Sequence, residues 1–155
     1  MRVLLLVGRS GVGKTTLLEQ AVRALTADGH KVLACKHSHH DLADQEGTDS
    51  ARLAEAGASS VALLGQQGFH LFGHPLGLED LLPFLASFYD VALVEGGKRS
   101  PYPKVELAGT DPGMLEPERV VAYLQRGDTP DDPRPVAELL EILWSEGATI
   151  SPAKA

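Results

Sequence analysis

The sequence predicts an α/β domain in which helices cover both faces of a mainly parallel central sheet. Short apolar segments alternate along the chain with longer segments whose apolar positions recur at helical spacing. The chain begins with a strand, a helix and a second strand, an order that requires a right-handed crossover and a parallel pair of strands. Together these observations predict three layers with the sheet in the middle.

The first crossover lies at the start of the chain. Arg2–Val7 is a short apolar run that ends at Gly8, as expected of a buried strand. Lys14–Ala27 is predicted as a helix because its apolar side chains repeat every three or four positions. Lys31–Cys35 is predicted as the second strand.

The middle of the chain predicts a short helix, a hairpin and a longer helix. The helix is placed at Asp49–Ala56. Ser60–Leu64 and Phe69–Phe72 are apolar runs joined by a glycine-containing turn, which indicates a β-hairpin. Because its returning arm carries aromatic residues, this hairpin is the candidate surface for pairing with a second copy of the chain. Leu78–Phe88 is predicted as a helix that bends or breaks at Pro83.

The last third predicts three strands and a helix. Val91–Glu95 is an apolar strand, Lys104–Ala108 a short edge strand, and Val120–Leu124 a last buried strand. Pro135 suits the first turn of a final helix that runs to Ser145. We therefore expect one domain at residues 1–146, followed by a frayed tail at 147–155.

Composition and charge exclude several classes of protein. Of the 155 residues, 43% are hydrophobic and 23% are charged, which argues against disorder. A single cysteine, Cys35, excludes a disulfide framework and a multi-cysteine zinc site. The 14 basic residues against 21 acidic ones give a net charge of −7, which argues against a nucleic-acid partner. No apolar run approaches the roughly 20 residues of a membrane span, so we expect a cytoplasmic protein.

A complete phosphate-loop motif lies between the first strand and the first helix. Gly8-Arg9-Ser10-Gly11-Val12-Gly13-Lys14-Thr15 matches the pattern in full, which argues against a glycine turn that only joins two elements. The glycines let backbone N–H groups face a phosphate, and the start of the helix adds its positive end. Lys14 suits the β- and γ-phosphates, and the hydroxyl of Thr15 suits Mg²⁺. The predicted nucleotide-binding residues are Gly8, Ser10, Gly11, Val12, Gly13, Lys14, Thr15 and Thr16. The fold class is thus a three-layer phosphate-loop NTPase fold.

A carboxylate follows the apolar strand Val91–Glu95. Proteins with a phosphate loop use a carboxylate at such a strand end to hold Mg²⁺ or its water. Glu95 lies at the end that faces the loop, whereas Asp90 lies at the opposite end and is interpreted as a turn residue. Thr15 and Glu95 are therefore the candidate metal ligands, and Glu95 is a candidate catalytic residue.

A histidine-rich segment follows the second strand. Lys36-His37-Ser38-His39-His40-Asp41 could hold a transition metal, or it could be a polar loop that serves phosphate, Mg²⁺ or a partner. At this place in the predicted fold the loop lies near the γ-phosphate. Asp41 could then reach Mg²⁺ or orient the attacking water, which makes it the second candidate for catalysis and metal binding.

Segments beyond the phosphate loop carry a more specific resemblance. They are Lys36-His37-Ser38-His39-His40-Asp41, Asp49-Ser50-x-Arg52, Glu55-Ala56-Gly57-Ala58, Val94-Glu95-Gly96-x-Lys98 and Pro103-Lys104-Val105-Glu106. With the phosphate loop they span most of residues 2–106, and the chain resembles the molybdopterin-guanine dinucleotide biosynthesis adapter protein B family. One departure is Gly97, where the family has an aromatic residue.

The resemblance implies a GTP-binding homodimer with at most weak, Mg²⁺-dependent hydrolysis. It implies an adapter that assists a separate molybdopterin guanylyltransferase, which joins GMP to molybdopterin. The side chains expected to contact a partner or the pterin are Lys36, His37, His39, His40, Lys98 and Lys104. Whether molybdopterin binds this chain directly is left open.

The guanine-reading residue has to be sought outside the usual motif. The common Asn-Lys-x-Asp signature is absent, because the chain contains no asparagine. In related folds the base lies over the loop after a late strand, here Arg126-Gly127-Asp128. Asp128 could accept the N1 and N2 protons of guanine, or it could be an ordinary turn residue.

Two other functions fit a phosphate loop. A small-molecule or nucleotide kinase would need arginines on a lid, and Arg99, Arg126 and Arg134 are isolated, which counts against it. A metal-insertion GTPase would use the histidine segment as a metal relay, and tight nickel or zinc binding at His37, His39 and His40 would favour it.

Overall fold

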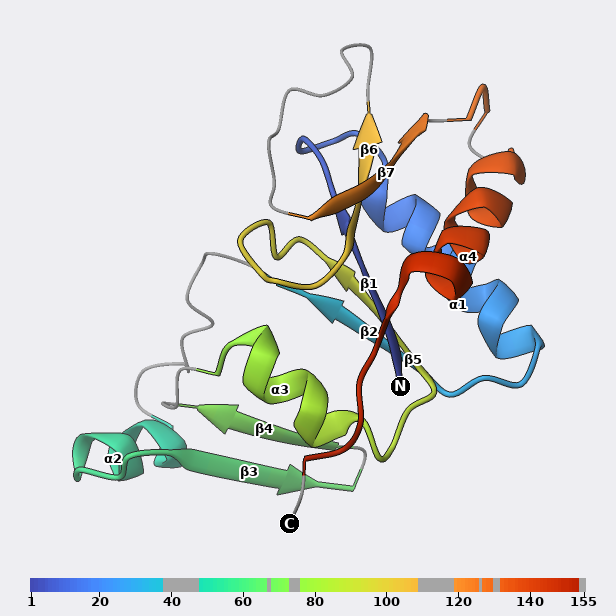
Figure 1. The fold of residues 1–155 in the computed structure, drawn as a ribbon. Helices are drawn as coiled ribbons and strands as arrows, with labels where there is room; N and C mark the ends of the chain where they lie inside the picture. Colours follow the sequence, from blue (N-terminus) through green and yellow to red (C-terminus); the bar gives the residue numbers. More distant parts are fainter. Residues whose placement is uncertain are drawn as a thin grey trace. The chain divides into compact units, whose positions relative to one another are not determined.

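The computed structural model describes residues 1–37, 48–66, 68–72, 76–108, 119–125, 127–129 and 132–153. The chain forms two compact units where we expected one domain. The larger unit comprises Met1–Ser38 and Leu78–Ala155, and the smaller one comprises His39–Gly77. Both are drawn in Figure 1.

A parallel sheet forms the centre of the larger unit. Its strands follow the order β2-β5-β1-β6-β7, and every neighbouring pair in this order is parallel. The bounds are β1 Arg2–Val7, β2 Val32–Lys36, β5 Val91–Glu95, β6 Lys104–Ala108 and β7 Val120–Gln125. Because the strands are parallel, their carboxyl ends meet at one edge, where the phosphate loop follows β1.

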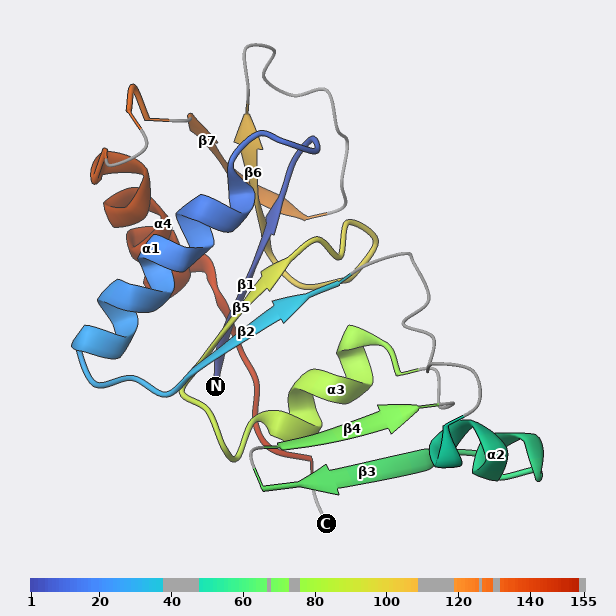
Figure 2. The same cartoon turned by 180° about the vertical axis from the view of Figure 1, so that it is seen from behind.

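Helices cover both faces of this sheet, as Figures 1 and 2 show from opposite sides. α1 (Lys14–Ala27) and α4 (Arg134–Glu146) pack on one face through an apolar cluster that includes Leu18, Leu25 and Leu139. α3 (Leu78–Leu85) packs on the other face through Leu78 and Leu82. The predicted three-layer arrangement is therefore present. Of the helices in the described ranges, none is long and apolar enough to cross a bilayer.

Two strand positions differ from the prediction. Lys104–Ala108 was expected at an edge, but β6 lies between β1 and β7 and all five of its residues are buried. Val120–Leu124 was expected to be buried, but β7 is the outer strand, and Val121 and Tyr123 are 38% and 51% exposed. Polar Lys104 and Glu106 are buried in β6, whereas the alternating pattern of β7 is that of a half-buried edge strand.

Two segments near the ends of helices also differ. The tail expected to fray forms β8 (Ala148–Thr149), which pairs antiparallel with Arg2 and Val3 of β1. α3 ends at Leu85 instead of Phe88, two residues after Pro83. After Leu85 the backbone continues with i→i−3 hydrogen bonds, from Ala86 N to Pro83 O at 3.4 Å and from Phe88 N to Leu85 O at 3.0 Å.

The smaller unit contains a helix and the predicted hairpin. α2 spans Asp49–Glu55, and the hydroxyl of Thr48 caps it by accepting a hydrogen bond from Ala51 N at 3.2 Å. β3 (Val61–Gly65) and β4 (Gly68–Phe72) pair antiparallel as a separate two-stranded sheet. The hairpin prediction is thus confirmed.

Candidate functional site

The phosphate loop connects β1 to α1 through a backbone that requires glycine. Gly11 and Gly13 have φ of +76° and +98°, in the left-handed region that other residues avoid. A Cβ on Gly8 would lie 2.7 Å from a carbonyl oxygen of β6. The first hydrogen bond of α1 runs from Leu17 N to Gly13 O at 3.0 Å. The N–H groups of residues 14–16 therefore have no acceptor within the helix, and they form an anion site.

Lys14 is the first residue of α1, and its ammonium group lies over the loop. Its Nζ donates to the carbonyl oxygens of Arg9 at 2.6 Å and of Gly8 at 3.3 Å. Partial burial lowers the pKa of Lys14, and the carboxylate of Glu95 opposes that shift. The ammonium is thus held at the anion site and within electrostatic reach of the carboxylate.

Thr15 and Glu95 meet at the carboxyl edge of the sheet. Glu95 ends β5, where it lies in register with Leu6 of β1 and Lys36 of β2. The hydroxyl of Thr15 donates to Oε2 of Glu95 at 2.7 Å. A hydroxyl and a carboxylate are hard oxygen ligands of the kind that Mg²⁺ prefers, so this pair fits the expected cation.

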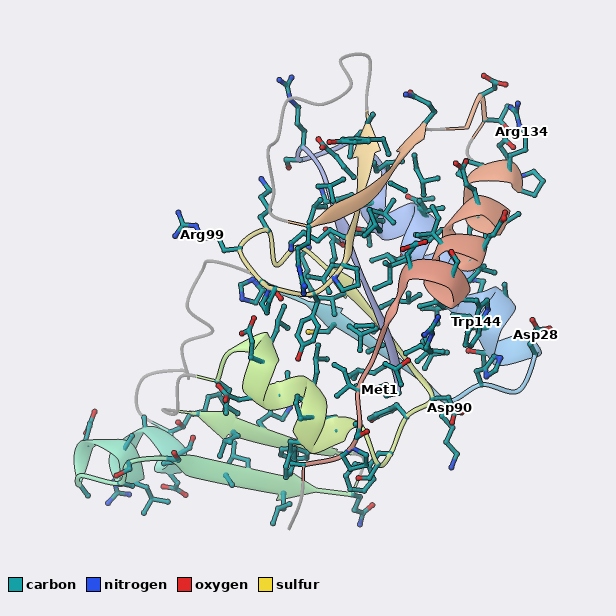
Figure 3. All side chains as sticks on the ribbon, viewed as in Figure 1. Met1, Asp28, Asp90, Arg99, Arg134 and Trp144 are labelled. Atoms are coloured by element: carbon teal, nitrogen blue, oxygen red, sulfur yellow. The ribbon has the colours of Figure 1, made fainter. Side chains whose placement is uncertain are left out.

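Asp90 lies at the opposite end of β5, as expected. Its Oδ2 accepts a hydrogen bond from Lys31 N at 2.8 Å. The carboxylate therefore ties the start of β5 to the start of β2. Figure 3 shows Asp90 beside Met1, far along the strands from the phosphate loop.

The two lysines that flank Glu95 lie near Lys14. Lys36 ends β2 directly opposite Glu95, and both line one cavity together with Thr15. Lys98 follows Glu95 by three residues on an exposed turn. Besides burial, the ammonium groups of Lys98 and Lys36 lower the pKa of Lys14. Positive charge from Lys36 and Lys98 thus adds to that of Lys14 near the phosphate loop.

Lys104 does not face a ligand, contrary to the prediction. Its side chain is fully buried in β6, and its Nζ donates to the carbonyl oxygens of Ser100 and, at 2.9 Å, of Tyr102. Burial of an ammonium requires such partners. Lys104 therefore holds the connection between β5 and β6 in place, and it is removed from the residues that could contact a partner or a pterin.

Most of the histidine-rich segment falls outside the described residues. His39, His40 and Asp41 belong to the range 38–47, so their predicted roles stay predictions. His37 is described, and its backbone N donates to Glu95 O at 2.9 Å. Among the residues that the structure covers, no three histidine, cysteine, aspartate or glutamate side chains gather as a metal site would need.

A second cavity lies on the other side of the phosphate loop. It has a volume of about 170 Å³ and is lined by residues of α1, β6 and the connection between β7 and α4. Thr16 and Gln20 contribute from α1, and Gly127 and Thr129 from the connection. This is the side on which the sequence placed the nucleotide base.

Asp128 was the predicted reader of guanine, but the structure shows Asp132 in the lining of this cavity instead. The side chain of Asp128 is 87% exposed and pairs with Arg134. Asp132 is 7% exposed and accepts hydrogen bonds from Asp128 N at 3.1 Å and Arg134 N at 3.0 Å. Its hydrogen bonds with Arg134 hold the pKa of Asp132 well below its usual range.

Sequence reasoning missed Asp132, although a signal was present. Asp132-Pro133-Arg134-Pro135 combines an aspartate with prolines at the start of a helix, the pattern of a cap that organises the preceding loop. Gly127 shows how closely the loop packs, because a Cβ there would lie 2.5 Å from the Cβ of Asp132.

The described arginines do not form a kinase lid. Arg134 is engaged with Asp132 and Asp128, which raises the pKa of its guanidinium. Figure 3 shows Arg99 pointing away from the strands. Arg126 lies outside the described residues. The kinase alternative thus gains no support from the part of the chain that is described.

Comparisons with known proteins point to one family. The model of the family described as "Molybdopterin guanine dinucleotide synthesis protein B" matches residues 3–123. The chain is 41% identical over 107 residues to the molybdopterin-guanine dinucleotide biosynthesis adapter protein of Haemophilus influenzae, covering 66% of this chain and 60% of that protein. It is 39% identical over 119 residues to the protein of the same name from Escherichia coli, covering 72% of this chain and 68% of that protein. The chain thus spans less than two thirds of the Haemophilus relative.

Solved structures confirm the fold. A MobB protein homolog from Bacillus stearothermophilus superposes with a TM-score of 0.64 at 24% identity, covering 92% of this chain and 98% of that chain. Bacillus subtilis MobB gives a TM-score of 0.61 at 24% identity, covering 91% of this chain and 97% of that chain. At these identities the likeness shows the fold alone, which is the predicted phosphate-loop NTPase fold.

Proposed function

The chain belongs to the molybdopterin guanine dinucleotide synthesis protein B family, and from this premise we propose that it is a nucleotide-binding adapter of molybdenum cofactor biosynthesis. In this role it binds GTP with Mg²⁺ and assists a separate guanylyltransferase that joins GMP to molybdopterin. Its own hydrolysis of GTP is weak. The observation that carries the proposal is the complete phosphate loop with Thr15 held 2.7 Å from Glu95.

The loop supports triphosphate binding by backbone and charge together. The N–H groups at the start of α1 point toward the anion site, and the helix dipole favours negative charge there. Lys14 adds one ammonium, whose present partners are neutral carbonyl oxygens of the loop. A phosphate oxygen is a stronger acceptor than a carbonyl, so the ammonium gains a charge-assisted bond when nucleotide binds.

The oxygen ligands at the carboxyl edge fit Mg²⁺. Thr15 and Glu95 would hold the ion or its water, and Asp41 is a further candidate from the sequence alone. The chemistry that Mg²⁺ supplies when bound is neutralisation of charge on the terminal phosphates. Glu95 itself fixes the hydroxyl of Thr15, and its position between β1 and β2 keeps the pair at the mouth of the loop.

The cavity beside Thr16 and Gln20 is proposed to take the base. It is bounded by the start of α1 and by the connection between β7 and α4, so a nucleotide whose phosphates lie in the loop can reach it. The carboxylate of Asp132 shapes this connection through its bonds to Asp128 N and Arg134. Asp128 is kept from the sequence as a candidate acceptor for guanine; its exposed carboxylate pairs with Arg134 and is not among the described residues that line the cavity.

The β3–β4 hairpin is proposed as part of a homodimer interface. Ala62 lies opposite Leu71 and Leu64 opposite Phe69, so one face of this hairpin is entirely apolar. Leu64, Phe69 and Leu71 are 87%, 55% and 45% exposed. An exposed apolar hairpin is a surface that a partner chain covers.

Nucleotide titration tests the nucleotide-binding part of this proposal. We expect calorimetry to detect GTP binding that depends on Mg²⁺, with ATP competing weakly, and hydrolysis that is slow compared with that of dedicated GTPases. Chelation of Mg²⁺ by EDTA is the matched control. No binding of GTP in the presence of Mg²⁺ would contradict the proposal.

A further inference from the structure

The lysines beside Glu95 offer more positive charge than one phosphate-loop lysine provides. Lys36 pairs in register with Glu95, Lys98 follows Glu95 by three residues, and the charges of both act on the ammonium of Lys14. The carboxylate of Glu95 also acts on Lys14, and its Oε2 accepts a hydrogen bond from the hydroxyl of Thr15. Like charges repel one another, and the single carboxylate of Glu95 does not balance three ammonium groups, so a further anion would stabilise the arrangement.

Lys36 is placed at the site by strand register. It is the last residue of β2 and pairs in register with Glu95 of β5. It also lines the cavity that contains Thr15 and Glu95. Lys31 directly precedes β2 at its other end; its backbone N donates to Oδ2 of Asp90, and it lines a different cavity. Strand pairing therefore places Lys36 at the end of β2 that lies nearest the phosphate loop.

Lys98 is carried on a turn that the structure fixes at both ends. Gly96 and Gly97 have φ of +96° and +73°, and a Cβ on Gly97 would lie 2.8 Å from Leu78 and 2.9 Å from Leu5. The close packing leaves no room for a side chain at position 97 without a shift of Leu78 and Leu5. A hydrogen bond from Ser100 N to Gly97 O at 3.0 Å closes the turn.

Lys104 fixes the end of the same turn. Buried Lys104 donates to the carbonyl oxygens of Ser100 and Tyr102. The ammonium of Lys104 is bonded to the backbone, so the exposed cations of the turn are Lys98 and Arg99, and Arg99 points away from the strands in Figure 3. Across the described ranges, the side chains of Lys36 and Lys98 have no hydrogen bond and no ion pair.

We propose that Lys36 and Lys98 form a subsite for a dianionic terminal phosphate, next to the phosphate that Lys14 binds. This inference rests on the proposed nucleotide-binding function and adds a determinant to it. A terminal phosphate carries between about −1.5 and −2 charges near neutral pH, which the two ammonium groups balance. The same chemistry belongs to the γ-phosphate of a nucleoside triphosphate and to a separate phosphomonoester that binds beside a nucleoside diphosphate.

Calorimetry with three ligands tests the subsite and separates its two sources. The ligands are GDP, the non-hydrolysable imido analogue of GTP, and ribose 5-phosphate titrated into GDP-loaded protein, all with Mg²⁺. The variants are Lys36→Ala and Lys98→Ala, and Lys98→Arg keeps the charge. Lys31→Ala removes the same charge at the opposite end of β2 and is the matched control.

If the subsite binds the γ-phosphate, Lys36→Ala and Lys98→Ala should each lower the affinity for the triphosphate analogue by about tenfold or more. Their affinity for GDP should change by less than about twofold. A phosphomonoester source predicts unchanged nucleotide affinities and loss of ribose 5-phosphate binding. In both cases Lys98→Arg retains most of the parent affinity, and Lys31→Ala behaves as the parent.

Two results would overturn the inference. If Lys36→Ala and Lys98→Ala bind all three ligands with the affinities of Lys31→Ala, the subsite is excluded. If the variants lose as much affinity for GDP as for the triphosphate analogue, the lysines act through a general effect of charge and not through a subsite. A parent chain that binds neither nucleotide contradicts the proposed function itself, and that outcome is seen before any variant is made.

Discussion

The hydroxyl of Thr15, in the first turn of α1, donates a 2.7 Å hydrogen bond to Oε2 of Glu95, the last residue of β5. The two residues are 80 positions apart in the sequence. The bond exists because β5 is inserted beside β1, so that the ends of both strands meet at the phosphate loop. This contact joins the phosphate-binding and metal-binding parts of the site.

Replacing Lys14 by alanine should weaken nucleotide binding without unfolding the protein. The ammonium contacts carbonyl oxygens of the loop, and Lys14 is not part of either apolar cluster. Loss of a charge-assisted contact should cost roughly 1.5–3 kcal/mol, or about ten- to a hundredfold in affinity for GTP. Calorimetry measures the affinity, and a thermal melt checks folding. Unchanged affinity in a folded variant would remove the loop from the nucleotide site.

Glu95→Gln should reduce Mg²⁺-dependent hydrolysis more than it reduces nucleotide binding. The amide oxygen can still accept the hydrogen bond from Thr15, but the charge that attracts the metal is lost. We expect hydrolysis to fall by about 10–100-fold, the usual cost of losing a group that orients a metal. Asp41→Asn should act in the same direction.

Asp90→Asn is the matched control for this experiment, because Asp90 is a carboxylate at the other end of β5. Its loss should leave hydrolysis unchanged. If Glu95→Gln hydrolyses GTP at the parent rate, the metal site does not include Glu95.

Gly127→Ala should destabilise the connection between β7 and α4. The added Cβ would lie 2.5 Å from the Cβ and 2.9 Å from Oδ2 of Asp132, so the loop has to shift. Overpacking of this kind costs about 1–3 kcal/mol of unfolding free energy. Gly68→Ala is the control, because nothing lies within 4 Å of a Cβ there. Equal urea midpoints for the two variants would show that Gly127 is not closely packed in solution.

Asp132 should make stability depend on pH. Its pKa in the folded protein is lowered by hydrogen bonds with Arg134. A lowered folded-state pKa adds stability that is fully present above the unfolded value, near about 3.9, and is lost as the pH falls toward the folded value. Asp132→Asn should therefore be less stable than the parent at pH 7, and the difference should shrink by pH 3. Urea unfolding at both pH values measures this, and a constant difference would contradict it.

Elements with strong local signals could be predicted from the sequence. Lys14–Ala27 and Val91–Glu95 were placed at the observed bounds, because apolar periodicity and a flanking turn define each of them. Strand order depends on pairing between distant segments, which local pattern does not encode. That is why β6 was expected at an edge although it lies inside the sheet.

The candidate site likewise has residues that local sequence motifs predict and residues whose role only the fold shows. The phosphate-loop motif predicts the nucleotide-binding residues, and the carboxylate at the end of an apolar strand predicts Glu95. Lys104 was misread, because only the fold shows that its ammonium turns to the backbone of Ser100 and Tyr102. Asp132 carried a local signal in Asp132-Pro133-Arg134-Pro135, but its packing against Gly127 is visible only in the fold.

The most direct test of the adapter proposal measures guanylylated product. A molybdopterin guanylyltransferase is supplied with molybdopterin and limiting GTP, with and without this chain. The account predicts that the chain alone makes no product, that it raises the yield of the transferase in a GTP-dependent way, and that Lys14→Ala abolishes the gain. The double variant His39→Ala with His40→Ala should abolish it too, whereas Lys31→Ala should keep it. Equal yields with and without the chain, together with rapid phosphoryl transfer to a small acceptor, would contradict the account and favour a kinase.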